Sequence, residues 1–155
     1  MSDKLHKQIA VELQQLNRLL EVHQPLLDKC ANEVPSEIEI SALAAMLHSF
    51  YTGIENIFKR IVLELGDTLP SGNAWHRELL DAISTASAPD ATVISTALRD
   101  RLREYLRFRH VFRQAYSFEL RWEKMIWLVL GCEETLRLVE AELVGLWQTS
   151  DEETK

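Results

Sequence analysis

Apolar residues recur at steps of three and four along most of the chain, which is the spacing of amphipathic α-helices. Near the N-terminus this stripe consists of Leu5, Ile9, Leu13, Leu16 and Leu20. Pro25 is expected to kink or end this first helix, because its ring removes a helical hydrogen bond and clashes with the preceding turn.

A second helix is predicted between Pro35 and Gly66. Ser36 is followed three residues later by Glu39, the pattern of a capping box at a helix N-terminus. Gly66 is a natural stop, since glycine readily adopts the left-handed conformation that ends many helices. The inward positions of this helix are Ile40, Leu43, Leu47, Phe50, Ile54, Ile57, Ile61 and Leu65.

The second half of the chain predicts one short and two long helices. Turn residues mark a loop over 67–73, and a short helix over 74–84 ends before Ala88-Pro89-Asp90. A long helix runs over roughly 91–116 and breaks at Ser117 and Phe118.

The last helix covers about 120–148, and residues 149–155 form a polar tail. Its inward positions are Trp122, Ile126, Val129, Leu136, Val139, Leu143 and Leu146. The predicted fold class is all-α: an antiparallel four-helix bundle with one short additional helix, in a single domain over 1–148.

Composition agrees with one globular domain and narrows its setting. The 155 residues are 46% hydrophobic and 26% charged, and five Gly and four Pro are too few for an all-β fold with many tight turns. Cys30 and Cys132 are isolated, so reduced thiols are expected instead of a disulfide framework. No signal-peptide core is evident, and the apolar run 125–132 is too short to span a bilayer. We therefore expect a cytoplasmic protein.

Several enzyme classes lack their sequence signatures. The chain contains no glycine-rich phosphate loop, no HExxH pair, no Glu-x-x-His spacing of a di-iron bundle and no GxSxG elbow. No metal or other cofactor is therefore expected.

Positive charge gathers on one helix of an acidic chain. Six arginines and two acidic residues lie between 99 and 113, a local formal charge of +4, which leaves −11 for the rest of a chain whose net charge is −7. One interpretation is a solvated helix face with ion pairs to Asp100 and Glu104. Arg103 and Arg107 are expected to point outward and need no other explanation.

Arg109 does not fit a solvated face. At about 100° per residue, it lies in the middle of the apolar stripe formed by Leu98, Leu102, Tyr105, Phe112 and Tyr116. Arg113 lies about 40° away. Desolvating a guanidinium is costly unless an anion receives it. Two solutions remain open: a structural bridge to a buried carboxylate such as Glu55 or Glu119, or a cleft at a subunit interface that receives a phosphate.

The same helix carries further groups suited to a phosphodiester. His110 and Gln114 are neighbours at the edge of the face that holds Arg109. Arginine can stabilise phosphorane-like charge, and histidine can move the 2′-hydroxyl proton in RNA cleavage. Such a set would require no metal.

The stretch RFRHVFRQAY resembles the signature helix of HEPN-domain proteins, in particular HepT-like ribonuclease toxins. That signature is an Arg, four to six residues of which the first is usually polar, a His, and a Tyr two residues later. Arg109 matches the Arg, His110 the polar residue and Tyr116 the Tyr. Residues 47–61 and 75–80 also look like the corresponding helices, so the resemblance covers most of the chain.

Gln114 stands where this signature has its catalytic His. Glutamine can hydrogen-bond a phosphate but cannot exchange protons near neutral pH. His110 is the obvious substitute. A second register, from Arg103 over six residues to His110, also fits the looser spacing, although Arg103 points about 120° away from Arg109.

The resemblance implies a cytoplasmic RNA endonuclease toxin that acts as a homodimer, with a composite cleft where the two signature helices meet. From its place beside Arg109, Arg113 is the candidate for binding the RNA phosphate. The antitoxin would be a small MNT-type nucleotidyltransferase that attaches AMP to Tyr116. Two alternatives are a catalytically degenerate HEPN module that binds a nucleotidyltransferase, and a helical interaction domain whose arginines bridge a partner's acidic residues.

Other residues are expected to serve packing. Trp75 and His76 are interpreted as packing and capping features of the short helix, and His48 as a satisfied core histidine. Gly53 suggests a close approach between helices. The last helix also carries aromatic bulk on more than one face, which suits a dimer interface as well as a core; these residues are Trp122, Trp127 and Trp147.

Overall fold

The computed structural model describes residues 2–84 and 93–153, and helices are the regular structure found there. In chain order they are α1 (Asp3–Cys30), α2 (Glu37–Glu64), α3 (Trp75–Ser84), α4 (Thr96–Gln114), the 3-10 turn η1 (Ser117–Glu119) and α5 (Trp122–Glu153). The all-α prediction of a helical bundle with one short additional helix is confirmed.

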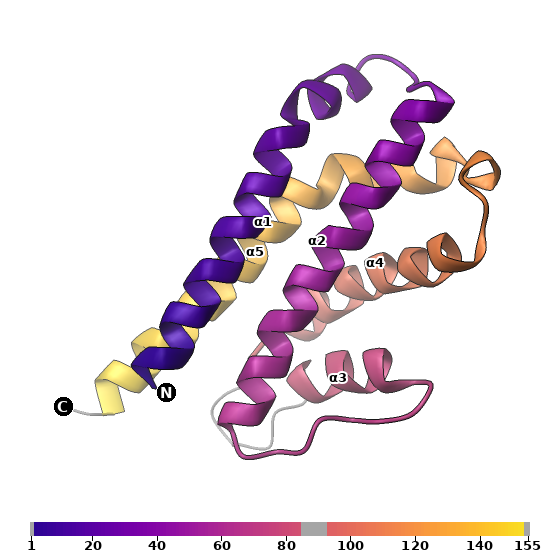
Figure 1. Cartoon of the computed structure of the whole chain (residues 1–155). Helices are drawn as coiled ribbons and strands as arrows, with labels where there is room; N and C mark the ends of the chain where they lie inside the picture. Colours follow the sequence, from indigo (N-terminus) through magenta and orange to yellow (C-terminus); the bar gives the residue numbers. More distant parts are fainter. Residues whose placement is uncertain (1, 85–92, 154–155) are drawn as a thin grey trace.

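Helix α2 is the centre of the bundle, since it contacts α1, α3, α4 and α5. The chain reverses between α1 and α2 and again between α4 and α5, and the start of α1 lies beside the end of α5 (Figure 1). The short α3 packs mainly against α2 and α4. Helices α2, α3 and α4 therefore all pack against one another.

Local sequence signals set several helix ends. Ser36 accepts a hydrogen bond from the Glu39 backbone while the Glu39 side chain accepts one from the Ser36 backbone, so the predicted capping box is present. Gly66 follows α2 with φ of 82°, the left-handed conformation expected of a helix stop. At α4 the Ser95 hydroxyl accepts from the Leu98 backbone.

Several predicted helix boundaries were wrong. Pro25 was expected to kink or end the first helix; α1 does not end there but runs to Cys30, because Leu27 and Cys30 continue its buried stripe. Helix α4 begins at Thr96 and ends at Gln114, since Ala115 is extended, with φ −103° and ψ 148°. The last helix reaches Glu153, past the expected end near 148. The predicted turn at 88–90 and the start of a helix at 91 lie outside the described residues.

Gly53 marks the expected close contact of α1 and α2. A Cβ atom built on Gly53 would lie 2.6 Å from Cδ2 of Leu16, which is buried. Cys30 and Cys132 are buried and unpaired, and burial raises the pKa of the Cys132 thiol to about 11. That thiol stays protonated at neutral pH, so it is a packing residue and not a nucleophile.

Candidate functional site

Arg109 is received by a buried carboxylate. Its side chain is 12% exposed, and its Nη1 lies 3.4 Å from Oε1 of Glu55 on α2, which is 2% exposed. Glu55 is thus the partner among the two carboxylates considered from the sequence, and Glu119 is exposed in η1. The charge of Arg109 is offset within the bundle.

His76 joins this pair from α3. Its Nδ1 lies 2.7 Å from Oε2 of Glu55, and Nη1 of Arg109 lies 2.8 Å from the same Nδ1 and 3.4 Å from Nε2. The ring also packs on Trp75, with centroids 3.6 Å apart. His76 therefore does more than the packing expected from the sequence, because its ring also links α3 to the buried ion pair.

His48 completes the surroundings of Arg109. Nε of Arg109 donates to Nε2 of His48 at 3.4 Å, and the imidazole packs on Phe112 with centroids 5.4 Å apart. Burial lowers the pKa of His48, and the nearby cations of Arg109 and Arg113 lower it further. A neutral His48 ring can accept this hydrogen bond, as expected of a satisfied core histidine.

The other side of this cluster opens into a groove between α3 and α4 of about 890 Å³, which we call the arginine groove. Its lining consists of Asn73, Ala74, His76, Arg77, Asp81, Arg103, Leu106, Arg107, Arg109, His110, Val111 and Arg113. Five arginines face one carboxylate there, in a chain of formal charge −7. The structural bridge considered for Arg109 is therefore present, and Arg109 also lies on the wall of this basic groove.

The cations of the arginine groove differ in how far they are neutralised. Arg107 pairs with Glu104 at 2.6 Å, and Arg103 pairs with Asp81 of α3 at 3.2 Å. Arg77 and Arg113 are exposed and form no ion pair with the described residues. These two side chains are thus available to an anion.

Arg103 departs from its expected outward position. Its side chain is 31% exposed, and its buried Nε has no hydrogen-bond partner among residues 2–84 and 93–153. The reason is the short α3, which covers the part of α4 that helical spacing alone assigns to solvent. Arg103 therefore contributes to the groove as well.

Comparison with family models identifies the family of this chain. A family model described as HepT-like protein matches residues 42–149, which include α3, α4 and most of α2 and α5. The chain belongs to the HepT-like protein family. No curated protein and no solved structure is detectably similar to it.

The structure brings some of the HepT-like signature positions together and separates others. The signature residues Arg109 and His110 line the arginine groove, as does Arg113, and His110 is exposed. Gln114 is the exposed last residue of α4 and is not among the groove-lining residues. Tyr116 lies beyond the helix end, so its expected place on the apolar stripe is wrong; it is 71% exposed and stacks on Phe118 with centroids 5.4 Å apart.

Sequence reasoning named Glu55 only as one possible partner and missed His76 as a site residue. A signal was present in both helices. His76 falls on the stripe of Leu80 and Ile83, which are buried, and Glu55 lies on one face of α2 with the buried Tyr51 and Phe58. A titratable residue on an inward stripe requires a polar partner. Here His76 and Glu55 are partners of each other.

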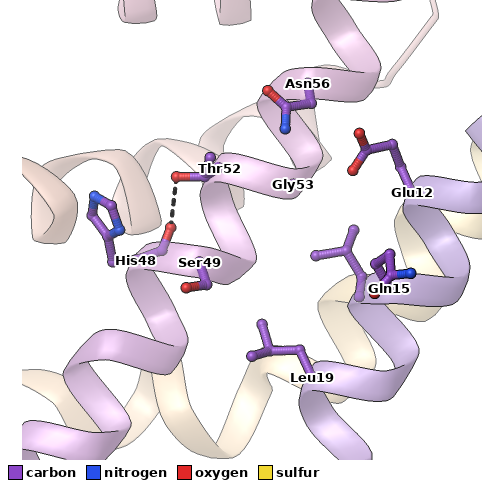
Figure 2. Close-up of a pocket in the computed structure, with 9 residues that line it drawn as sticks. Glu12, Gln15, Leu19, His48, Ser49, Thr52, Gly53 and Asn56 are labelled. Atoms are coloured by element: carbon purple, nitrogen blue, oxygen red, sulfur yellow. Dashed lines mark hydrogen bonds between the residues drawn. The ribbon is translucent and has the colours of Figure 1, made fainter.

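A second hollow lies between α1 and α2 and has a volume of about 350 Å³ (Figure 2). Its one charged side chain, Glu12, pairs with Arg60 at 3.8 Å. The Thr52 hydroxyl donates to the His48 carbonyl at 2.9 Å, and the His48 ring points away from α1 (Figure 2). This hollow lacks the concentration of charge found in the arginine groove, so we place the functional site in the groove.

Two further searches gave negative results for the part of the chain that is described. No group of three or more His, Cys, Asp or Glu side chains in 2–84 and 93–153 is arranged to hold a metal ion. Among the same residues, no helix combines the length and apolar character of a membrane span.

Proposed function

We propose that this HepT-like protein is the toxin of a toxin–antitoxin pair and cleaves RNA without a metal ion. The observation that carries the proposal is the arginine groove, in which the signature residues Arg109 and His110 line one basic cleft together with Arg113. Guanidinium groups suit this task because they neutralise phosphate and donate paired hydrogen bonds to it. Backbone phosphates of RNA are the polyanion that this charge would attract.

Each groove residue has a role in this proposal. Arg113 is exposed and free to bind the RNA phosphate, while Arg109 is fixed by Glu55 and stabilises the negative charge that develops on the phosphoryl oxygens. His110 is exposed beside them and exchanges the proton that Gln114 cannot. The protein would act in the cytoplasm, where cellular RNA is its substrate.

The proposed active form is a homodimer with a cleft composed from two chains. A third hollow, of about 520 Å³, adjoins the arginine groove and shares Arg107 and Val111 with it. Exposed apolar side chains surround this region: Val111, Phe118 and Trp127, the last 79% exposed. Exposed aromatic residues beside a charged site are typical of a protein interface, and a second copy of the chain would cover them.

Incubating the purified protein with tRNA and mRNA tests this function. The wild type is expected to cleave RNA and to elute as a dimer, whereas Arg113→Ala is expected to cleave about 10-fold or more slowly because a phosphate contact is lost. Arg113 is exposed, so the variant keeps the fold. Intact RNA after incubation with the wild type would contradict the proposal, and a monomer at working concentration would contradict the composite cleft.

A second candidate is favoured by Gln114, namely a catalytically degenerate HEPN module that binds a nucleotidyltransferase. The same assay separates the two candidates when Gln114→His is run beside the wild type. Cleavage by both proteins supports the toxin, whereas cleavage by Gln114→His alone identifies a degenerate site that the substitution repairs.

Tyr116 is the proposed point of control by an MNT-type nucleotidyltransferase antitoxin. Tyr51 and Tyr105 are buried, and burial raises the pKa of each phenol, whereas Tyr116 is 71% exposed. Co-expression with a neighbouring nucleotidyltransferase is therefore expected to add one AMP per chain, at Tyr116, and none to Tyr116→Phe. The added phosphate would oppose RNA binding by its charge. Mass spectrometry measures the modification, and an unmodified Tyr116 would remove this part of the proposal.

A further inference from the structure

We propose that His76, oriented by Glu55, is the catalytic base of RNA cleavage in this chain. The inference rests on the proposed ribonuclease function and assigns a residue outside the signature helix. It answers the chemical question raised by Gln114, since cleavage needs one group to accept a proton and another to donate one. His110 alone cannot do both in one step.

The contact with Glu55 fixes which nitrogen of His76 carries the proton. An ionised carboxylate only accepts hydrogen bonds, so Nδ1, 2.7 Å from Oε2 of Glu55, is the donor. In the neutral ring Nε2 then carries the lone pair. A buried carboxylate that holds a histidine in one tautomer and stabilises its protonated form is the arrangement of known general bases.

Arg109 leaves that lone pair available. An atom on the lone-pair axis of Nε2 would lie farther from Nδ1 than from Nε2. Nη1 of Arg109 is instead closer to Nδ1, at 2.8 Å, than to Nε2, at 3.4 Å. The guanidinium therefore lies beside the ring near its Nδ1 side, off the axis of the Nε2 lone pair.

His76 is also accessible and held in place. Its side chain is 20% exposed and lines the arginine groove together with Arg109, His110 and Arg113. The ring of Trp75, itself covered by Lys59 at 4.4 Å, packs against the imidazole. A bound phosphodiester would thus meet two histidines and two guanidinium groups in one groove.

Charged groups from three helices surround His76. Glu55 and Lys59 belong to α2, and Arg77 and Asp81 to α3 itself. The groups on α4 are Arg103, Arg107, Arg109, His110 and Arg113. Glu55 is in direct contact with the ring, and the arginines line the groove beside it.

The proposed step balances as follows. Nε2 of His76 removes the proton of the ribose 2′-hydroxyl, and the 2′ oxygen forms a bond to phosphorus. The bond from phosphorus to the 5′ oxygen breaks, and the imidazolium of His110 donates a proton to that leaving oxygen. The products are a 2′,3′-cyclic phosphate and a 5′-hydroxyl end. His76 ends protonated beside Glu55 and His110 ends neutral, and both exchange protons with water to restore the starting state.

Steady-state kinetics of full-length variants over a range of pH tests the assignment. His76→Gln keeps an amide donor for Glu55 and is expected to lower kcat by about 10²–10⁴-fold with little change in KM. A base must be unprotonated, so this variant should lose the rise in rate on the acidic side of the profile. An acid must be protonated, so His110→Gln should lose the fall in rate on the alkaline side.

Two further variants guard against a purely structural effect. Added imidazole is expected to restore part of the rate of His76→Ala, which a folding defect would not allow. His23→Gln serves as the matched control, because His23 lies on α1 and contacts the Leu19 carbonyl; both limbs of its profile should remain.

The outcomes separate the inference from the function on which it rests. If the wild type cleaves RNA and His76→Gln retains both its rate and the acidic limb, the assignment of His76 is overturned while the ribonuclease function stands. If the wild type leaves RNA intact under all conditions, both are overturned. Loss of the acidic limb in His76→Gln, with rescue of His76→Ala by imidazole, supports the assignment.

Discussion

Replacing Arg109 with alanine is expected to lower the free energy of unfolding by about 3–5 kcal/mol. The physical reason is the partner that remains: Glu55 is 2% exposed, and its carboxylate would lose the guanidinium that offsets its charge. His76 also contacts Glu55 and offsets part of this charge only when protonated. Urea denaturation followed by circular dichroism measures the change.

Arg113→Ala is the matched control for this prediction. Arg113 lies one helical turn along α4 from Arg109 but is exposed, so its loss is expected to change the stability by less than about 0.5 kcal/mol. Replacing both members of the pair, Arg109→Met with Glu55→Leu, should recover most of the stability because no buried charge is left alone. A loss below about 1 kcal/mol for Arg109→Ala would mean that water already screens the pair.

Reversing the two free charges of the arginine groove is expected to weaken the binding of single-stranded RNA by about 10²-fold near 0.15 M salt. The double variant is Arg77→Glu with Arg113→Glu, both exposed and without ion pairs to described residues. Losing two phosphate contacts should reduce the slope of log affinity against log salt by about 1.4, or 0.7 for each single-strand contact. Fluorescence anisotropy of a labelled oligonucleotide at several salt concentrations measures both quantities.

The control variant for this experiment has the same change in net charge, but at a different place on the surface. Lys7→Glu with Arg18→Glu alters two exposed residues of α1, away from α3 and α4. This variant is expected to change the affinity only slightly, because charges beyond a Debye length are screened. Equal weakening by both double variants would show that overall charge, and not the groove, controls binding.

Most of the fold follows from local pattern. Steps of three and four place apolar residues on one side of each helix, and Ser36 with Glu39 fixes a helix start through contacts within four residues. Where the prediction was wrong, tertiary packing was responsible. Pro25 is tolerated inside α1 because Leu27 and Cys30 bury the following turn.

The candidate site was only partly predictable. The position of Arg109 on an apolar stripe predicted that an anion or a partner must receive it, and helical geometry justified that expectation. The prediction for Tyr116 was wrong, because helical spacing was applied beyond Gln114, where α4 ends. Ala115 is extended, and the chain therefore turns Tyr116 out to solvent.

Periodicity and motif spacing are enough to predict the helical bundle, the family signature and the conflict between charge and burial at Arg109. The packing of the helices is needed to show that Glu55 resolves this conflict, that His76 joins the pair and that Arg103 turns into the groove. The physical reason is that helical periodicity orders residues around one axis. Which residues meet across two axes depends on where α2, α3 and α4 cross, and that is set by the packing of the whole core.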